Sequence, residues 1–274
     1  MSSLEGLPED CLSLILSRTS PIDVCRLASV SRFFSVAARS NVTWLSLLPS
    51  DYADALRCYE ARSYEKPYPL PDLRNRREVF RWLSNAIILV SSYEGYFILK
   101  HTGGVCRVLS ASAMNIAWGD DCRFWRWNSS RSSIFPSVAH LLADCWLEVT
   151  GKWSCTLPPG KYSVSWRLKV VNPQGGQRHF LMWLRPLRFF LSHSGITLEK
   201  ELDFLYLPSN AYEKWFEFEV GQIHVKGPGR NVVHVDLDFG FRELDCSFWK
   251  GGLYLDCLTN RIWYAGALVC FEQQ

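Results

Sequence analysis

Long uncharged apolar runs are missing from this sequence of 274 residues. A membrane-spanning helix needs about 20 consecutive apolar residues, and the nearest approach is the short run 86–90. The first eight residues contain Glu5 and have neither a basic start nor an apolar core, so we expect no secretory signal. The sequence therefore predicts a protein of the cytoplasm and nucleus, with no membrane partner.

A strong excess of one charge is also missing. The chain has 30 Lys and Arg residues against 27 Asp and Glu residues, for a formal net charge of +3. Nucleic-acid-binding domains usually carry a marked basic excess, so we expect no nucleic-acid partner. The basic group Arg74, Arg76 and Arg77 is typical of a solvated helix face, with a weak basic patch as the alternative.

The ten cysteines include no CxxC pair, and several lie within apolar runs. Since no secretory signal is expected, they are predicted to be reduced core residues and not a disulfide framework. They stand at positions 11, 25, 58, 106, 122, 145, 155, 246, 257 and 270.

Motifs of the common enzyme classes are absent as well: the sequence has no GxSxG, HExxH, P-loop or dinucleotide fingerprint. Glu217 and Glu219 could imitate the carboxylate pair of a glycosidase, and His234 with Asp236 and Asp238 could bind a metal ion. Polar residues on the exposed face of a strand are the simpler interpretation of both sets. We expect no catalytic residue, no metal site and no cofactor.

The composition that remains is that of a globular protein. Hydrophobic residues make up 48% of the chain and charged residues 21%, and the length fits one or two domains. The 12 Trp, 11 Tyr and 16 Phe residues are enough for a large core, with some left for a surface site.

Residues 1–48 have the pattern of short helices. Pro8 suits a first helical turn, and Ser20 can cap a second helix that begins with Pro21. A third helix is expected to start at Asn41. Each helix is too short to be stable alone, so we expect a small bundle or a docking partner.

Residues 49–95 are predicted to form a helical connector. Its helices are expected at 53–62 and 76–88, separated by the proline cluster at 67–71. Asp72 could cap the second of them.

After about residue 95 the hydrophobic period changes from 3.6 to 2. Apolar and polar residues alternate along 162–170 and 233–239, which is typical of strands with one buried and one wet face. Gly- and Pro-containing turns separate these segments. The pattern predicts an antiparallel sandwich or jelly roll, interrupted by one helix at 137–145.

Ordered motifs near the start of the chain resemble an F-box, over residues 4–48. They are Leu7-Pro8-Glu9-Asp10, Ile15, Ser20-Pro21-Ile22-Asp23-Val24, Val30-Ser31-Arg32-Phe33-Phe34 and the closing Trp44. This resemblance implies a three-helix segment that binds a Skp-type adaptor and, through it, the cullin of a RING ubiquitin ligase.

A block of this size has more apolar side chains than it can bury, and a partner groove is the natural place for them. Leu12, Leu16 and Val30 could face either the partner or the block's own core. The whole set could instead pack on the C-terminal domain. The residues that we expect to face the adaptor are Leu7, Pro8, Ile15, Pro21, Val24 and Leu27.

A second group of motifs lies in the C-terminal part of the chain. Its members are residues 110–127, 145–153, 215–221 and 249–253. They resemble the phloem protein 2 (Nictaba-like) lectins of plants over residues 96–274, more loosely in 260–271. The resemblance implies a β-sandwich that binds N-acetylglucosamine oligomers or N-glycans.

The family's sugar contacts map onto Trp118, Trp125 and Glu217. Sugars lay their C–H faces on indole rings and need carboxylates for their hydroxyl groups, and Asp120 and Asp121 lie between the two tryptophans.

The second acid of the family would fall near Asn210, where there is no carboxylate and Glu213 is a displaced substitute. Among Phe124, Trp125 and Trp127, at least one must pack inward. Five further tryptophans are assigned to the core or to strand ends: Trp146, Trp166, Trp183, Trp249 and Trp263.

The fold class is therefore α+β multidomain, with a three-helix F-box at 1–48, a helical connector at 49–95 and a jelly-roll-like antiparallel β-sandwich at 96–274. The function that follows is capture of targets for a ubiquitin ligase. Capture through glycans is one hypothesis, and a protein–protein module with a decayed sugar site is another. A lectin that acts outside any ligase is the third.

Overall fold

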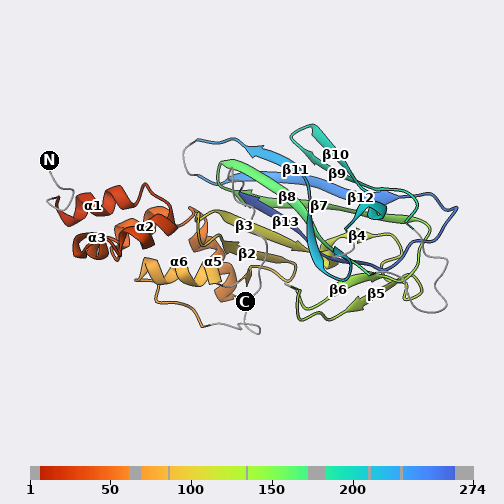
Figure 1. Ribbon diagram of the computed structural model, residues 1–274, viewed down its shortest axis with the longest axis horizontal. Helices are drawn as coiled ribbons and strands as arrows, with labels where there is room; N and C mark the ends of the chain where they lie inside the picture. Colours follow the sequence, from red (N-terminus) through yellow and green to blue (C-terminus); the bar gives the residue numbers. More distant parts are fainter. Residues whose placement is uncertain are drawn as a thin grey trace. The chain divides into compact units, whose positions relative to one another are not determined.

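The computed structural model describes most of the chain, in two compact units (Figure 1). The helical unit is Met1–Arg107 with Arg230–Val232, and the sandwich unit is Val108–Gly229 with Val233–Gln274. The described residues are 7–61, 69–85, 87–133, 135–171, 183–208, 211–228 and 231–262. No helix among these residues is long and apolar enough to cross a membrane.

The helical unit begins with four short helices, and serine side chains cap three of them. Ser20 accepts a hydrogen bond from Asp23 N, Ser31 from Phe34 N, and Ser40 from Val42 N. The starts predicted near Pro8, Ser20 and Asn41 are confirmed, and Ser31 starts a further, unpredicted helix. The helices are α1 (Glu9–Leu16), α2 (Pro21–Leu27), α3 (Arg32–Ala37) and α4 (Asn41–Leu47).

Two longer helices and a short hairpin complete the helical unit: α5 (Tyr52–Ala61), α6 (Arg76–Asn85), β1 (Ile88–Leu89) and β2 (Glu94–Ile98). The first predicted connector helix agrees with α5. The second was predicted to reach Ile88, but α6 ends at Asn85 and Ile88 pairs with Tyr96 in the hairpin. Asn75, not Asp72, caps α6, by accepting a hydrogen bond from Glu78 N at 3.2 Å.

The core of the helical unit joins the first helices to the connector. Trp44 donates its indole N–H to Ala38 O at 2.7 Å and packs on Phe80 of α6 at 5.1 Å between ring centroids. The buried carboxylate of Asp51 accepts hydrogen bonds from the Tyr96 hydroxyl and from Arg107, both at 2.9 Å. These contacts bind residues of the predicted F-box and connector into one packed body.

The sandwich unit consists of two antiparallel sheets. One has the order β10-β9-β12-β7-β4. In the other, β11 pairs with β8, β8 with β13, β13 with β6, and β6 with β5, and Figure 1 shows β11, β8 and β13 side by side.

The strands of the sandwich unit are two to 11 residues long. The strands are β3 (Val105–Ser110, which begins in the helical unit), β4 (Asn115–Ile116), β5 (Trp125–Asn128), β6 (Val138–Leu141), β7 (Leu147–Leu157), β8 (Gly160–Val170), β9 (Leu187–His193), β10 (Ile196–Leu202), β11 (Trp215–Val225), β12 (Val233–Glu243) and β13 (Leu253–Ile262).

Aromatic side chains fill the space between the two sheets. Trp166 of β8 meets Phe189, Phe239 and Phe241 of the opposite sheet edge-on, at 5.0 to 5.9 Å between centroids. Edge-to-face contacts of this kind add to the free energy gained by burying apolar area. The predicted antiparallel sandwich is confirmed.

Two local predictions for the sandwich unit are wrong. The segment 137–145, predicted as a helix, contains the strand β6, because its backbone pairs with β5 and β13 and tertiary pairing overrides local helix preference. The predicted wet face of β8 is partly covered, since Ser165 and Arg167 are buried.

Candidate functional site

The loop between β4 and β5 presents Trp118 to solvent in a strained conformation. Trp118 has φ +58°, a region that non-glycine residues rarely adopt, and 58% of its surface is exposed. A Cβ on the next residue, Gly119, would approach the Cβ of Ile116 to 2.9 Å. Strain of this kind persists only when the surroundings enforce it, and it clusters at binding sites.

Two indole N–H groups hold the loop on either side of Trp118. Trp125 donates to Ala117 O at 3.1 Å, and Trp127 donates to Gly119 O at 3.1 Å. The carbonyl groups that flank Trp118 are therefore both fixed by side chains of β5. These two hydrogen bonds account for the strained backbone conformation of Trp118.

Trp125 was expected to stack on a sugar together with Trp118, and its placement corrects that expectation. Only 2% of its surface is exposed, and its ring belongs to the sandwich core. A ring enclosed on both faces has no surface for a ligand. Trp125 acts on the loop through its N–H, so the predicted stacking pair is reduced to Trp118.

Two other aromatic rings extend the surface that begins at Trp118. Phe124 lies 6.0 Å from Trp118, and Trp249 lies 6.5 Å from Phe124 with the two rings nearly parallel, at 16°. Trp249 was assigned to the core or a strand end; it lies shortly before β13 and 45% of its surface is exposed, so it is not a core residue. We call Trp118, Phe124 and Trp249 the aromatic row.

A buried ammonium group fixes the chain next to Trp249. Lys250 is fully buried; its Nζ lies 2.5 Å from a carboxylate oxygen of Glu243, donates to Asp245 O at 2.9 Å, and also donates to Cys145 O. One charged group thereby ties the segment before Trp249 to the turn at Cys145. No sequence pattern indicated this contact, because its partners are mostly backbone carbonyls.

The two acids of the loop differ in their freedom to bind a ligand. Asp121 forms paired hydrogen bonds with Arg123 at 2.7 to 3.0 Å, and these bonds lower the pKa of its carboxyl group. Asp120 is exposed, and its carboxylate bonds to no residue in the described ranges. Asp120 is thus the acid beside Trp118 that remains open to a hydroxyl group.

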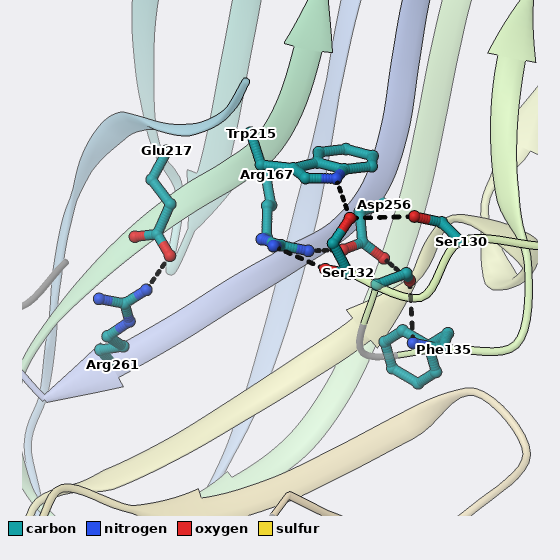
Figure 2. A network of polar contacts seen from close by, with 9 residues as sticks. Ser130, Ser132, Phe135, Arg167, Trp215, Glu217, Asp256 and Arg261 are labelled. Carbon is teal, nitrogen blue, oxygen red and sulfur yellow. Dashed lines mark hydrogen bonds and ion pairs between the residues drawn. The ribbon is translucent and has the colours of Figure 1, made fainter. Parts of the chain in front are cut away.

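Glu217 lies on β11, away from the loop that carries Trp118. Its carboxylate pairs with Arg261 of β13, as Figure 2 shows. Burial raises its pKa, and the guanidinium groups of Arg261 and Arg167 oppose that rise. Strands β8, β13 and β6 lie between β11, which carries Glu217, and β5, which follows the Trp118 loop.

A second buried ion pair lies close to Glu217 on the same sheet (Figure 2). Arg167 pairs with the fully buried carboxylate of Asp256 and donates to Ser132 O at 2.8 Å. Ser133 donates to Asp256 at 2.5 Å, and Trp215 donates to the Ser132 hydroxyl at 2.8 Å. This network fastens the segment that precedes β6 to the sheet and covers the face predicted to be wet.

The other acids that the sequence singled out, Glu213 and Glu219, lie outside the Trp118 loop. Glu219 accepts a hydrogen bond from Ser163 at 2.5 Å, not one shared with Glu217. Glu213 is exposed, at φ +63°. Asn210 and Trp263 lie outside the described residues.

The residues expected to face an adaptor divide into two groups. Leu7, Pro8 and Ile15 are exposed, as expected. Pro21 and Val24 are buried in the helical unit and Leu27 packs against its core, which corrects their assignment. Their spacing along α2 could not distinguish an internal contact from an external one.

Other apolar side chains of the first helices are exposed. Since α1 packs against both α3 and α4, exposed residues of these helices lie on adjoining elements. We call them, with Ile15, the apolar face: Leu14, Phe33, Val36, Val42 and Leu45. Val30, one of the open alternatives, is also exposed, whereas Leu12 and Leu16 are buried.

The structure also bears on the cysteines and on the possible metal ligands around His234. Among the cysteines of the described ranges, only Cys106, Cys155 and Cys257 are buried, so the others are not core residues, and no disulfide joins any two of the nine. His234 pairs with Asp236 at 3.2 Å, but no group of three or more potential ligands in the described part of the chain could hold a metal ion.

Two family models match the chain. The model of the F-box domain matches residues 4–46, and that of phloem protein 2 matches residues 104–261, more than half of the chain. The chain belongs to the phloem protein 2 family. It carries an F-box before the phloem protein 2 domain, as the motifs indicated.

Relatives with the same two parts occur in Arabidopsis thaliana. F-box protein PP2-A15 is 31% identical over 92% of this chain and 86% of its own length. F-box protein PP2-A13 is 29% identical over the same shares, and F-box protein PP2-B1 is 37% identical over 62% of this chain and 48% of its own. Among solved structures, a family 35 carbohydrate-binding module from Clostridium thermocellum aligns over 57% of this chain and 96% of its own length. The TM-score is 0.33 and the sequence identity 12%, and a structural similarity this low supports no argument.

Proposed function

We propose that this F-box member of the phloem protein 2 family is a substrate-recognition subunit of an SCF-type cullin-RING ubiquitin ligase. Its F-box binds a Skp-type adaptor, and its lectin-like domain captures glycan-bearing targets. The observation that carries the proposal is the apolar face on the F-box helices, which leaves large side chains in water unless a partner covers them. The chain itself performs no chemistry and works in the cytoplasm and nucleus.

The adaptor interface is tested by placing a charge on the apolar face. Phe33, at 54% exposure, contributes little to the core, so Phe33→Asp leaves the fold intact. Burying an unpaired carboxylate under the adaptor weakens binding by about 2–4 kcal/mol. Titration calorimetry of the purified chain with a plant Skp-type adaptor measures this loss.

Leu73→Asp is the matched control, because Leu73 is 46% exposed and lies outside α1–α4. It should bind the adaptor like the wild type. Full-strength binding by Phe33→Asp would remove the basis of the ligase role and favour a lectin that acts alone.

Glycan capture is supported by Trp118, whose exposed ring is held out by a clamped loop beside the open carboxylate of Asp120. Two observations favour the alternative, a protein–protein module with a decayed sugar site. Trp125 is enclosed in the core, and the carboxylate of Glu217 is engaged by Arg261.

A glycan array probed with the full chain and with Trp118→Ala decides between the two. Binding to N-acetylglucosamine oligomers or N-glycans that Trp118→Ala abolishes supports a ligase receptor for glycoproteins. A silent array from a chain that still binds the adaptor supports the protein–protein module.

A further inference from the structure

We propose that the aromatic row is one extended stacking surface, on which Trp249 binds a second sugar ring of the same oligosaccharide as Trp118. The proposal rests on the carbohydrate-binding function above. In it Trp249 has the stacking role that the buried Trp125 cannot have. The ligand it implies is a linear chain of pyranose rings such as an N-acetylglucosamine oligomer.

The geometry of the row fits an extended ligand. The centroid steps of 6.0 and 6.5 Å place three rings in succession, with Phe124 between two exposed indoles. Successive rings are tilted by 46° and 16°, and the Arg123 guanidinium lies over Phe124, 5.3 Å from its centroid, so the two exposed indoles are the rings that a ligand can reach. A linear oligosaccharide has an apolar C–H patch on each successive ring, so its repeating shape matches a repeated aromatic surface.

The polar groups beside the row also suit a sugar. A pyranose presents hydroxyl groups at its rim, and these need acceptors. Asp120, whose carboxylate bonds to no described residue, provides one at the Trp118 end. A purely apolar peptide segment would leave that carboxylate against an apolar surface, which is unfavourable.

Both ends of the row are fixed before any ligand arrives. The N–H groups of Trp125 and Trp127 hold the loop of Trp118, and the buried ammonium of Lys250 holds the segment of Trp249. A preorganised surface loses little conformational entropy when it binds. Rigid support of this kind distinguishes a binding surface from incidental exposure of aromatic rings.

The test is a titration of the full-length chain with N-acetylglucosamine and its β-1,4-linked dimer, trimer and tetramer. We expect wild-type affinity to increase about tenfold from the single sugar to the trimer as the second ring contact is added. Trp249→Ala should bind the single sugar normally and lose that increase. Trp118→Ala should lose binding to every length.

Tyr93→Ala is the control, because Tyr93 is also an aromatic residue with about half of its surface exposed, 50%, and it belongs to the helical unit. It should behave like the wild type, and thermal unfolding of each variant shows that the fold is retained. If affinity increases with length in Trp249→Ala as in the wild type, the second subsite is wrong while carbohydrate binding stands. If the wild type binds no length, carbohydrate binding and the second subsite both fail.

Discussion

Trp125 uses its ring to fill the core and its N–H to hold Ala117, whereas Trp118 leaves more than half of its surface to solvent. The two tryptophans of one motif thus have different tasks. Trp118 is the residue proposed to touch a ligand, and Trp125 is a positioning residue that keeps the loop in place.

This division of tasks predicts the behaviour of Trp125→Phe. The variant keeps an aromatic ring in the core but loses the bond to Ala117 O and leaves a cavity where the larger indole packed, so the free energy of unfolding should fall by about 2–3 kcal/mol. Affinity for the N-acetylglucosamine trimer, chitotriose, should also fall, since the loop of Trp118 is then held by Trp127 alone. Urea unfolding and the sugar titration measure the two effects.

Trp166→Phe is the control for that variant, because the N–H of Trp166 is buried without a hydrogen-bond partner. The same substitution there should leave chitotriose affinity unchanged. Equal affinities for Trp125→Phe and the wild type would show that the clamp does not position Trp118.

Between the elements, a few buried charges help to fix segments that lie outside the strands. The pair of Arg167 with Asp256 fastens the segment before β6 to the sheet, and Lys250 fastens the segment before β13. Both cations bind backbone carbonyls as well as a carboxylate, so each one organises a stretch of chain.

Removing the carboxylate of the first pair should therefore be costly. Asp256→Ala leaves the Arg167 guanidinium buried without its counter-charge, and we expect unfolding free energy to fall by about 3–5 kcal/mol. Asp238→Ala breaks the exposed ion pair with Lys152 and should change the free energy of unfolding by less than about 0.5 kcal/mol. Urea unfolding of both variants tests the difference, and similar losses would contradict it.

How far the sequence predicts these elements depends on whether the deciding contact is local. The alternation along β8 and the serine before α2 act within one element, so the sandwich strand and the helix start could be predicted. The helix expected at 137–145 failed because pairing with two other strands decides that segment. Periodicity also could not show that Trp125 faces inward while Trp249 is exposed.

For the molecule as a whole, each proposed binding surface belongs to one compact unit. The apolar face lies entirely in the helical unit, and the aromatic row lies entirely in the sandwich unit. This arrangement suits an adaptor, because each surface can bind its own partner with residues that the other does not share.

Separate surfaces predict a double dissociation of function. Phe33→Asp should lose adaptor binding and keep chitotriose binding, and Trp118→Ala should do the reverse. Measuring both affinities for both variants tests this, with Leu73→Asp and Tyr93→Ala as controls. Loss of both activities in either variant would contradict the assignment of one function to each unit.

Because Trp118 has a left-handed backbone conformation, substitutions at this position affect thermal stability and ligand binding differently. Glycine adopts φ +58° without strain and alanine does not, so Trp118→Gly should be more stable than Trp118→Ala by about 1 kcal/mol, and both should fail to bind sugar. Thermal unfolding of the two proteins gives the difference directly, and equal values would show that the loop is relaxed. Among variants that lack the indole, a selection for heat resistance would therefore favour glycine at position 118, in a protein that no longer recognises its target.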